Sequence, residues 1–313
     1  MPMLRYFLRR LLLLIPVLLG VSVVIFSIVH LAPGDPAEVM LGPSATQEDI
    51  ANLREQLGLN RPLYVQYGAF LGNALRGDLG RSMRSNAPVV EEIMDRFPAT
   101  LTLAVLGMAF AIGIGLPLGL LAALKQNTWI DALCSFVALA GFSIPNFWIA
   151  LMLMLLFSIY IPILPSSGID SWKNLVMPTI VLGVQTMAVI ARMTRSSMLE
   201  VIRQDYVRTA RAKGISDRLV LTRHILSNVM IPVVTIAGLY FGHSLGGVVV
   251  TETVFSIPGL GRLIVDAIRS HDYPVVQGGV LFFALCVGVV NLLVDMLYAA
   301  LDPRIKAQYR AAR

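Results

Sequence analysis

Charged residues are scarce in this sequence. Asp, Glu, Lys and Arg together make up 14% of its 313 residues, whereas soluble domains contain about 25%. Hydrophobic residues make up 56%, so too few polar side chains are present to cover a water-soluble globule of this length. Apolar runs of membrane-spanning length separate the charges, which excludes a disordered chain and a nucleic-acid-binding domain despite the net charge of +6. We therefore expect a polytopic membrane protein.

Residue patterns that hold metals or nucleotides are also missing. The two cysteines, Cys134 and Cys286, lie in apolar runs and have neither disulfide nor metal-ligand spacing. The four histidines are scattered, and none of the four lysines follows a glycine, so the chain lacks a phosphate-binding G-x-x-x-x-G-K-[ST] loop. We expect no metal site, no catalytic residue and no cofactor bound by this chain.

Six apolar segments are long enough to cross a membrane. They are Leu11–Leu31, Leu101–Leu124, Ala132–Ile161, Val176–Ala191, Val229–Val250 and Val275–Leu301. As a helix the first would span about 31 Å, close to the thickness of the hydrocarbon layer. The fourth is the least hydrophobic, and we expect its helix to continue toward Leu199. The sequence thus predicts an all-α membrane protein with six transmembrane helices.

The distribution of Lys and Arg predicts the orientation of these helices. If the N-terminus is cytoplasmic, the cytoplasmic segments hold sixteen basic residues and the outer segments nine, six of them in the single segment 32–98. Segments of that length cross the membrane largely regardless of their charge, so the charges of the short segments determine the orientation of the helices. Both termini are therefore expected in the cytoplasm.

Segment 32–98 reads as an insertion outside the membrane. It begins with turn-forming residues, and a short helix is expected near 47–57. Pro88 and Pro98 bracket a second expected helix, which is amphipathic and enters the next span. The insertion is too short for a separate domain. We therefore divide the chain into a first span plus insertion, 1–98, and a five-helix core, 99–313.

Residues 242–246 match G-x-S-x-G, the nucleophile elbow of serine hydrolases. That motif needs a strand–turn–helix context, whereas these residues lie in an apolar run of helical length. Glycines recur here every four residues, which favours a small-residue face for close helix packing, and an intramembrane serine hydrolase is the less favoured alternative. The candidate packing or pathway residues are Gly238, Gly242, His243, Ser244 and Gly246.

Two acidic residues lie within or beside the spans, Glu252 at the outer edge of the fifth and Asp295 in the last. Placing such a charge in the membrane costs about 2.5–3.5 kcal/mol, so each should face protein or water. A proton relay usually needs several such groups along one path. A proton-coupled secondary transporter is therefore a second, less favoured alternative. We interpret Asp295 instead as a structural residue that has a partner within the protein.

The most informative segment is the basic loop 192–232. Within it, residues 205–214 read D-Y-V-R-T-A-R-A-K-G, which predicts a short helix with an acid at its start and basic residues and glycine at its end. Small residues in its middle would let the helix seat closely in another protein, and Asp217 could cap the next helix. We interpret this segment as a docking element.

The same segment resembles the coupling segment of ABC importer permeases, whose general pattern is E-A-A-x-x-x-G. Aligned on Gly214, this sequence has R-T-A in place of E-A-A, and Ile231-Pro232 follows. At both of these positions the sequence departs from the general pattern and resembles the dipeptide/oligopeptide (peptide/nickel) branch of the family. In that branch, D-Y-x-R-T-A-R-A-K-G and R-H-x-L…I-P are typical. Further segments that resemble the first permease of this branch are 9–11, 30–36, 57–62, 77–82, 246–247, 252–255, 258–261, 273–274 and 302–303.

The resemblance implies a permease subunit in the bacterial inner membrane that imports dipeptides, oligopeptides or glutathione by alternating access, with nickel chelates as an alternative cargo. It implies a second homologous permease, two cytoplasmic ATPases that bind ATP and Mg²⁺, and a periplasmic or lipid-anchored binding protein. It also places the contact with the ATPases in a coupling segment of about 200–222. The expected coupling residues are Asp205, Tyr206, Arg208, Thr209, Ala210, Arg211, Ala212, Lys213 and Gly214.

Overall fold

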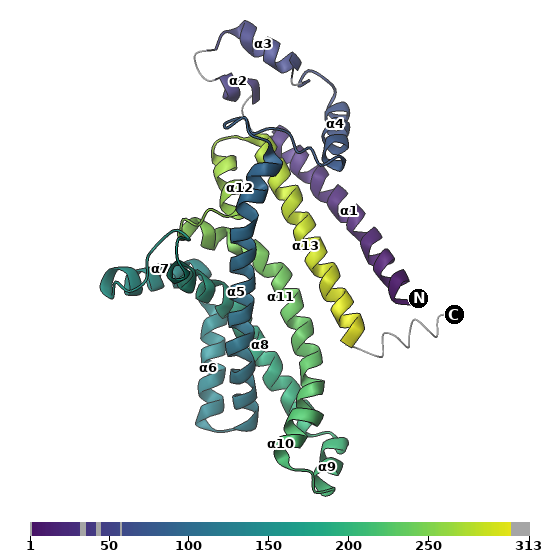
Figure 1. Cartoon of the computed structure of the whole chain (residues 1–313), viewed down its shortest axis with the longest axis vertical. Helices are drawn as coiled ribbons and strands as arrows, with labels where there is room; N and C mark the ends of the chain where they lie inside the picture. Colours follow the sequence, from purple (N-terminus) through teal and green to yellow (C-terminus); the bar gives the residue numbers. More distant parts are fainter. Residues whose placement is uncertain (1, 32–35, 42–44, 57, 302–313) are drawn as a thin grey trace. The chain divides into compact units, whose positions relative to one another are not determined.

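The computed structural model describes residues 2–31, 36–41, 45–56 and 58–301. Within them the regular secondary structure is helical, apart from one isolated β-bridge between Arg81 and Pro88 (Figure 1). The helices are α1 Pro2–Leu31, α2 Pro36–Leu41, α3 Gln47–Gln56, α4 Leu63–Leu75, α5 Val89–Leu124, α6 Trp129–Ser143, α7 Asn146–Met154, the π-helix η1 Leu155–Tyr160, α8 Trp172–Ile202, α9 Asp205–Ala212, α10 Asp217–Leu219, the π-helix η2 Val220–Ile225, α11 Leu226–Val254, α12 Leu260–Arg269 and α13 Tyr273–Leu301.

The chain divides into two compact units. Unit 1 contains the described residues up to 8, residues 100–257 and those from 289 on, and unit 2 contains residues 9–99 and 258–288. The first boundary lies one residue from the division expected between 98 and 99, but residues 258–288 group with the N-terminal part. The division into an insertion-bearing part and a transport core stays a prediction.

The core of unit 1 lies among α5, α8, α9 and α11. Ile190 of α8 and Val229 of α11 are fully buried in it. Two glycines let α5 approach α8 closely, because a Cβ on Gly115 would lie 2.6 Å, and one on Gly119 2.4 Å, from a backbone carbonyl oxygen of α8. A larger residue at either position would therefore push the two helices apart.

The third expected span is bent. The helices α6 and α7–η1 meet at 101°, so the third expected span, 132–161, consists of two helices with a break between them. The break lies at Ile144 and Pro145: proline lacks the N–H of a helical hydrogen bond and disfavours helical geometry in the preceding residue. Ile144 accordingly has an extended backbone, with φ −83° and ψ 129°.

The second expected span is longer than predicted. Helix α5 runs without interruption from Val89 to Leu124, so the helix expected between Pro88 and Pro98 is confirmed and continues directly into the second span. Pro98 lies inside α5 although it removes one backbone hydrogen bond. The first turns are held by packing, since Val89 and Ile93 are fully buried in the core of unit 2. That burial favours a continuous helix over a break at the proline.

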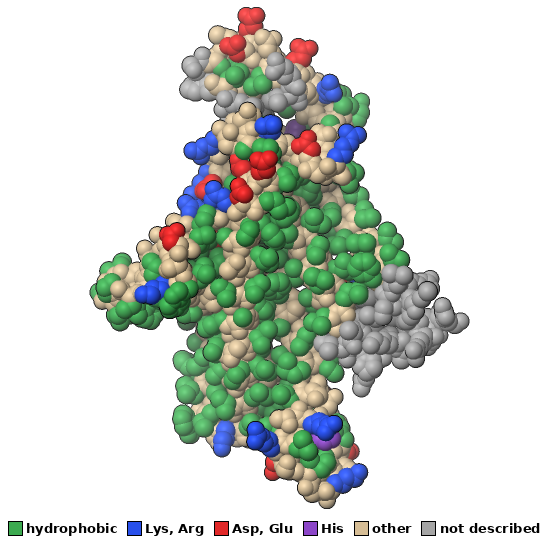
Figure 2. All heavy atoms as spheres, viewed as in Figure 1, with side chains coloured by type: hydrophobic (Ala, Val, Ile, Leu, Met, Phe, Trp, Pro, Cys, Tyr) green, Lys and Arg blue, Asp and Glu red, His purple; other side chains and the backbone are tan. Residues whose placement is uncertain are grey.

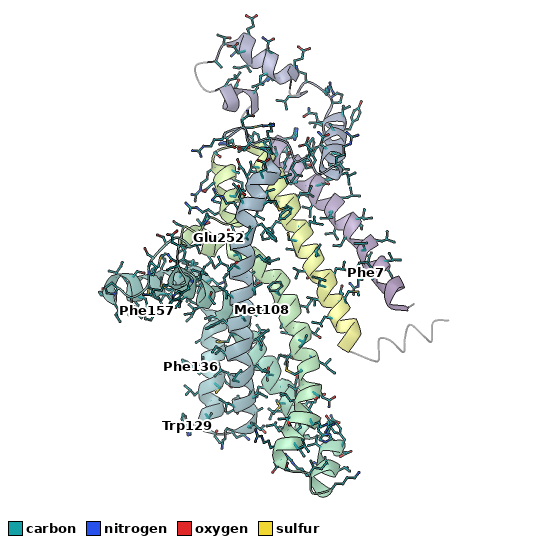
Figure 3. All side chains as sticks on the ribbon, in the orientation of Figure 1. Phe7, Met108, Trp129, Phe136, Phe157 and Glu252 are labelled. Atoms are coloured by element: carbon teal, nitrogen blue, oxygen red, sulfur yellow. The ribbon has the colours of Figure 1, made fainter. Side chains whose placement is uncertain are left out.

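Five described helices are long and apolar enough to cross a membrane, and the bent pair raises the number to six. The outer faces of these helices carry exposed apolar side chains. On α6, for example, Trp129 is 74% and Phe136 67% exposed (Figure 3). Hydrophobic side chains cover much of the visible surface of the long helices (Figure 2). Large exposed apolar surfaces of this kind require a lipid environment, because water would disfavour them. The chain is a multi-pass membrane protein.

Unit 2 holds the insertion. The helix expected near 47–57 is α3, which ends at Gln56; Leu57 and the turn residues 32–35 and 42–44 lie outside the described residues. Thr46 and Asp49 start α3 as a reciprocal cap, in which Asp49 N–H donates to Thr46 Oγ1 and Thr46 N–H to Asp49 Oδ2. The hydrogen bonds from Thr46 lower the pKa of the Asp49 carboxyl below its ordinary value.

Candidate functional site

The segment that resembles a coupling element forms helix α9 and its C-terminal turn. Gly214 adopts a left-handed conformation with φ +74°, and its N–H donates to Arg211 O at 2.9 Å. The N–H of Ile215 donates to Ala210 O at 3.3 Å. This pair of bonds is a Schellman motif, which satisfies the last carbonyls of a helix and needs a residue that tolerates positive φ. The glycine therefore ends α9 and redirects the chain.

Helix α9 is anchored on one side and exposed on the other. Val207 is fully buried and Ala210 is 7% exposed, and both pack in the core of unit 1. The sequence placed Ala210 among the contacts to a partner, whereas in the structure its side chain contacts its own chain. The exposed residues of the segment are Asp205, Tyr206, Arg208, Thr209, Arg211, Ala212, Lys213 and Gly214.

Polar contacts hold the exposed side of α9 to the next helices. Asn228 Nδ2 donates to Tyr206 Oη at 3.0 Å. Arg211 Nε lies 3.2 Å from Asp217 Oδ1, an exposed ion pair that contributes less than about 1 kcal/mol. The expectation that Asp217 caps the next helix is wrong: Ser216 occupies the N-cap of α10, with no side-chain cap hydrogen bond, and Asp217 follows it.

The position of α9 in the chain links it to two long helices. Only Arg203 and Gln204 separate it from α8. After α9, α10 and η2 lead into α11, and together they form one candidate span from Asp217 to Val254. Lys and Arg side chains are visible on the part of unit 1 that carries α9 and α10 (Figure 2). A force applied to α9 would therefore act on two membrane helices at once.

The small-residue face of α11 contacts α13 at two of its three glycines. A Cβ on Gly238 would lie 2.5 Å from a methyl carbon of Val294, and one on Gly242 would lie 2.7 Å from Asn291 Oδ1. Gly246 differs, because no atom lies within 4 Å of the position of its Cβ. The structure thus brings Gly238 and Gly242 into close helix contact and leaves Gly246 beside open space.

The G-x-S-x-G motif lies entirely inside α11. Ser244 Oγ donates to the carbonyl of Phe241 on the same helix at 2.8 Å. His243 is exposed, and its ring centroid lies 6.2 Å from that of Tyr240. A nucleophile elbow needs a sharp turn between a strand and a helix, so residues 242–246 do not have the geometry of a hydrolase site.

The two acidic candidates lie in different places. Glu252 is fully buried near the end of α11, where it accepts a 2.5 Å hydrogen bond from Thr100 Oγ1 of α5 (Figure 3). Asp295 is half-buried on α13, next to the Val294 that packs on Gly238. Gly238 and Glu252 are fourteen residues apart on α11, about 21 Å along the helix. The structure does not bring the two acids together, which weakens a proton-relay interpretation.

Motifs that are distant in the sequence meet in unit 2. Ser82, at the end of segment 77–82, donates to Asp272 Oδ2 at 2.5 Å, and the N–H of Met83 donates to Asp272 Oδ1 at 3.1 Å. Asp272 is 4% exposed and directly precedes the Tyr273-Pro274 pair. These contacts pin the loop before α5 to the turn between α12 and α13. Sequence reasoning missed Asp272.

These observations define the class: a helical, multi-pass membrane protein with a short exposed basic helix between two of its long helices and no phosphate-binding G-x-x-x-x-G-K-[ST] loop in its sequence. Residues 115–307 match the family described as binding-protein-dependent transport system inner membrane component, and residues 3–104 match the N-terminal region of that membrane component. The chain belongs to this family of ABC importer permeases, and the expectation from the sequence is confirmed.

Individual relatives cover nearly the whole chain. It is 48% identical to the dipeptide transport system permease protein DppB of Alkalihalophilus pseudofirmus, over 97% of this chain and 100% of that protein. It is 47% identical to the glutathione transport system permease protein GsiC of Escherichia coli K12, over 97% and 99%. An inward-facing structure of the MetNI methionine ABC transporter matches its fold with a TM-score of 0.59 at 18% identity, over 67% of this chain and 96% of that chain.

Proposed function

We propose that this chain is the first permease subunit of an ATP-driven importer of short peptides. The observation that carries the proposal is α9, an exposed basic helix anchored by Val207 and Ala210 and joined directly to α8 and, through α10 and η2, to α11. Family membership and the two relatives near 48% identity support it, since they are named for dipeptide and glutathione transport. Both cargoes are peptides, which favours peptides over nickel chelates.

The proposed assembly contains a second homologous permease, two cytoplasmic ATPases and a periplasmic or lipid-anchored binding protein. ATP and Mg²⁺ bind to the ATPases, and this chain supplies no catalytic residue. It lies in a bacterial inner membrane with both termini in the cytoplasm, as the excess of basic residues in the short loops indicates.

The proposed mechanism is alternating access. Closure of the ATPase dimer on ATP pushes α9, and the push reaches α8 and α11 because they are joined to it on either side. The helices then open the pathway outward, where the loaded binding protein releases its peptide. Hydrolysis returns the helices to the inward-open arrangement. Exposed Arg208, Arg211 and Lys213 provide ion pairs or hydrogen bonds to the ATPase surface.

The insertion is proposed to receive the binding protein. Its described residues up to 88 lie outside the candidate spans and include the helices α2, α3 and α4. A lid that only covers the helices is the alternative. A binding protein that stimulates ATP hydrolysis less after substitutions on α3, with unchanged basal hydrolysis, would favour docking over the lid.

Co-purification tests the assembly. The tagged chain is extracted from its native membrane in mild detergent, and its partners are identified by mass spectrometry. We expect a second permease and ATPase subunits in fixed proportion to this chain. A chain that purifies alone or only with itself would refute the proposal, and transport without any ATPase would then favour a secondary transporter.

A further inference from the structure

Unit 2 contains a cavity of about 830 Å³. Phe26 and His30 of α1 and Phe70 of α4 line one side, and the loop around Gly80 and Tyr273 at the start of α13 also line it. Cavities that hold small ligands measure about 300–1,000 Å³. The cavity therefore has room for a molecule of the size of a short peptide.

The walls of the cavity are held in place by hydrogen bonds. Gln66 Nε2 donates to the carbonyls of Leu59 and Arg61 at 3.0 and 2.8 Å, and Gln66 Oε1 lies 3.1 Å from Nε2 of His30. These bonds connect α1, α4 and the chain before α4. On the other side, buried Asp272 holds the loop after Gly80, as described above. Hydrogen bonds thus fix the walls of the cavity, which come from four separate segments.

The charged residues that line the cavity are mostly basic. Arg54, Arg61 and Arg81 are among them, and Asp78 is the one acidic residue of the described lining. Asp78 Oδ1 already accepts a hydrogen bond from the N–H of Gly80 at 2.9 Å. Guanidinium groups bind carboxylates with charge-assisted and often bidentate hydrogen bonds. This combination of basic residues and apolar rings suits a ligand with one anionic end and one apolar group.

A second observation points to a ligand. Tyr273 lines the cavity and is 7% exposed, yet its hydroxyl has no hydrogen-bond partner within the described part of the chain. Buried hydroxyls nearly always have a partner, because leaving one unpaired is unfavourable. A polar group of a bound ligand that reached this hydroxyl would supply the missing partner.

We propose that this cavity binds the carboxylate end of a short peptide, with Arg61 on the carboxylate and an apolar side chain against Phe26 and Phe70. The peptide would be held here before it enters the transport pathway. The cavity itself comes from the structure alone, whereas its place on the outer side of the membrane rests on the proposed function.

Peptide binding to the full-length chain tests this proposal. The chain, in its purified complex or alone, is placed in phosphatidylcholine nanodiscs without binding protein, and equilibrium binding of Ala-Phe and of its C-terminal amide is measured. We expect the free acid to bind about tenfold or more tightly than the amide. Arg61→Gln should weaken binding of the acid by a similar factor. Arg76→Gln removes the same charge from the same insertion but outside the cavity lining, and should change affinity less than twofold.

Tyr273→Phe adds a test that does not depend on charge. It should weaken peptide binding several-fold without lowering the melting temperature, because the hydroxyl has no described partner to lose. Tyr67→Phe is the matched control: its hydroxyl lies 2.9 Å from Ser22 Oγ, so it should lower stability without changing peptide affinity.

Three results would overturn the proposal: equal affinity for acid and amide, equal effects of Arg61→Gln and Arg76→Gln, or displacement of the peptide by anionic lipid vesicles but not by other peptides. Loss of stimulation by the binding protein in Arg61→Gln, at unchanged peptide affinity, would assign the cavity to a protein contact instead. The proposed function fails separately, if no ATPase co-purifies with the chain.

Discussion

The guanidinium of Arg195 on α8 holds the carboxylate of Asp131 on α6 at two points: Nε lies 2.7 Å from Oδ1, and Nη2 lies 2.8 Å from Oδ2. The N–H of Asn127 and the hydroxyl of Ser135 also donate to this carboxylate. Asp131 is 6% exposed, so it depends on these partners. Because α8 leads into α9, the pair makes α6 part of the body that α9 would move.

Breaking this pair should destabilise unit 1. Arg195→Gln leaves a nearly buried carboxylate without its cation. We expect the free energy of unfolding to fall by about 3 kcal/mol. This is the low end of the range for a buried ion pair, because Arg195 is about one-third exposed. The melting temperature of the purified complex should fall clearly. Asp131→Asn combined with Arg195→Gln should recover part of the loss, since no unpaired charge remains.

Arg203→Gln is the control, because Arg203 is exposed at the end of α8. Its melting temperature should stay within the error of the wild type. A double variant that is no more stable than Arg195→Gln alone would show that the pair contributes through packing and not through charge.

The crossing of α5 and α8 depends on two glycines. Gly119→Ala places a methyl group 2.4 Å from a carbonyl oxygen of α8, and we expect a destabilisation of about 1–3 kcal/mol. Gly113→Ala in the same helix is the matched control, because no atom lies within 4 Å of its Cβ position. It should be neutral or stabilising, since alanine favours helix by up to about 1 kcal/mol. Equal unfolding temperatures for the two variants would contradict the proposed close contact.

The glycines of α11 allow a similar comparison. Gly238→Ala and Gly242→Ala should weaken packing against α13, because their Cβ atoms would lie 2.5 and 2.7 Å from side chains of that helix. Gly246→Ala should not, because its Cβ meets no atom within 4 Å. Thermal unfolding of the three variants, together with peptide uptake in membrane vesicles, measures the difference. A defect in uptake confined to Gly246→Ala would instead place Gly246 on the transport pathway.

Much of the helical architecture follows from the sequence, because apolar length and the placement of charge determine membrane helices directly. The acidic residue at the start of segment 205–214 and the glycine at its end also predict the helix in this segment. The bend at Pro145 follows from the rule that a proline disfavours helical geometry in the residue before it. The continuity of α5 through Pro98 does not follow from local rules, because it depends on burial of Val89 and Ile93 by later helices.

The contacts that tie distant segments together could not be predicted from this one sequence. Asp131 and Arg195 are 64 residues apart, and Ser82 and Asp272 are 190 residues apart. Neither pair has a spacing that marks it, since the packing of helices alone brings the partners together. The same holds for the cavity in unit 2, whose lining comes from α1, α4, the loop before α5 and α13.

The central claim is that α9 couples ATP hydrolysis to transport, and ATP hydrolysis by the reconstituted complex tests it most directly. Arg208→Glu reverses a charge on the exposed face of α9 without touching buried Val207, and Arg76→Glu makes the same change in the insertion, on exposed Arg76. We expect Arg208→Glu to reduce hydrolysis in the presence of loaded binding protein to the unstimulated rate, with the complex still assembled, and Arg76→Glu to retain stimulation. Full stimulation in Arg208→Glu would contradict the account.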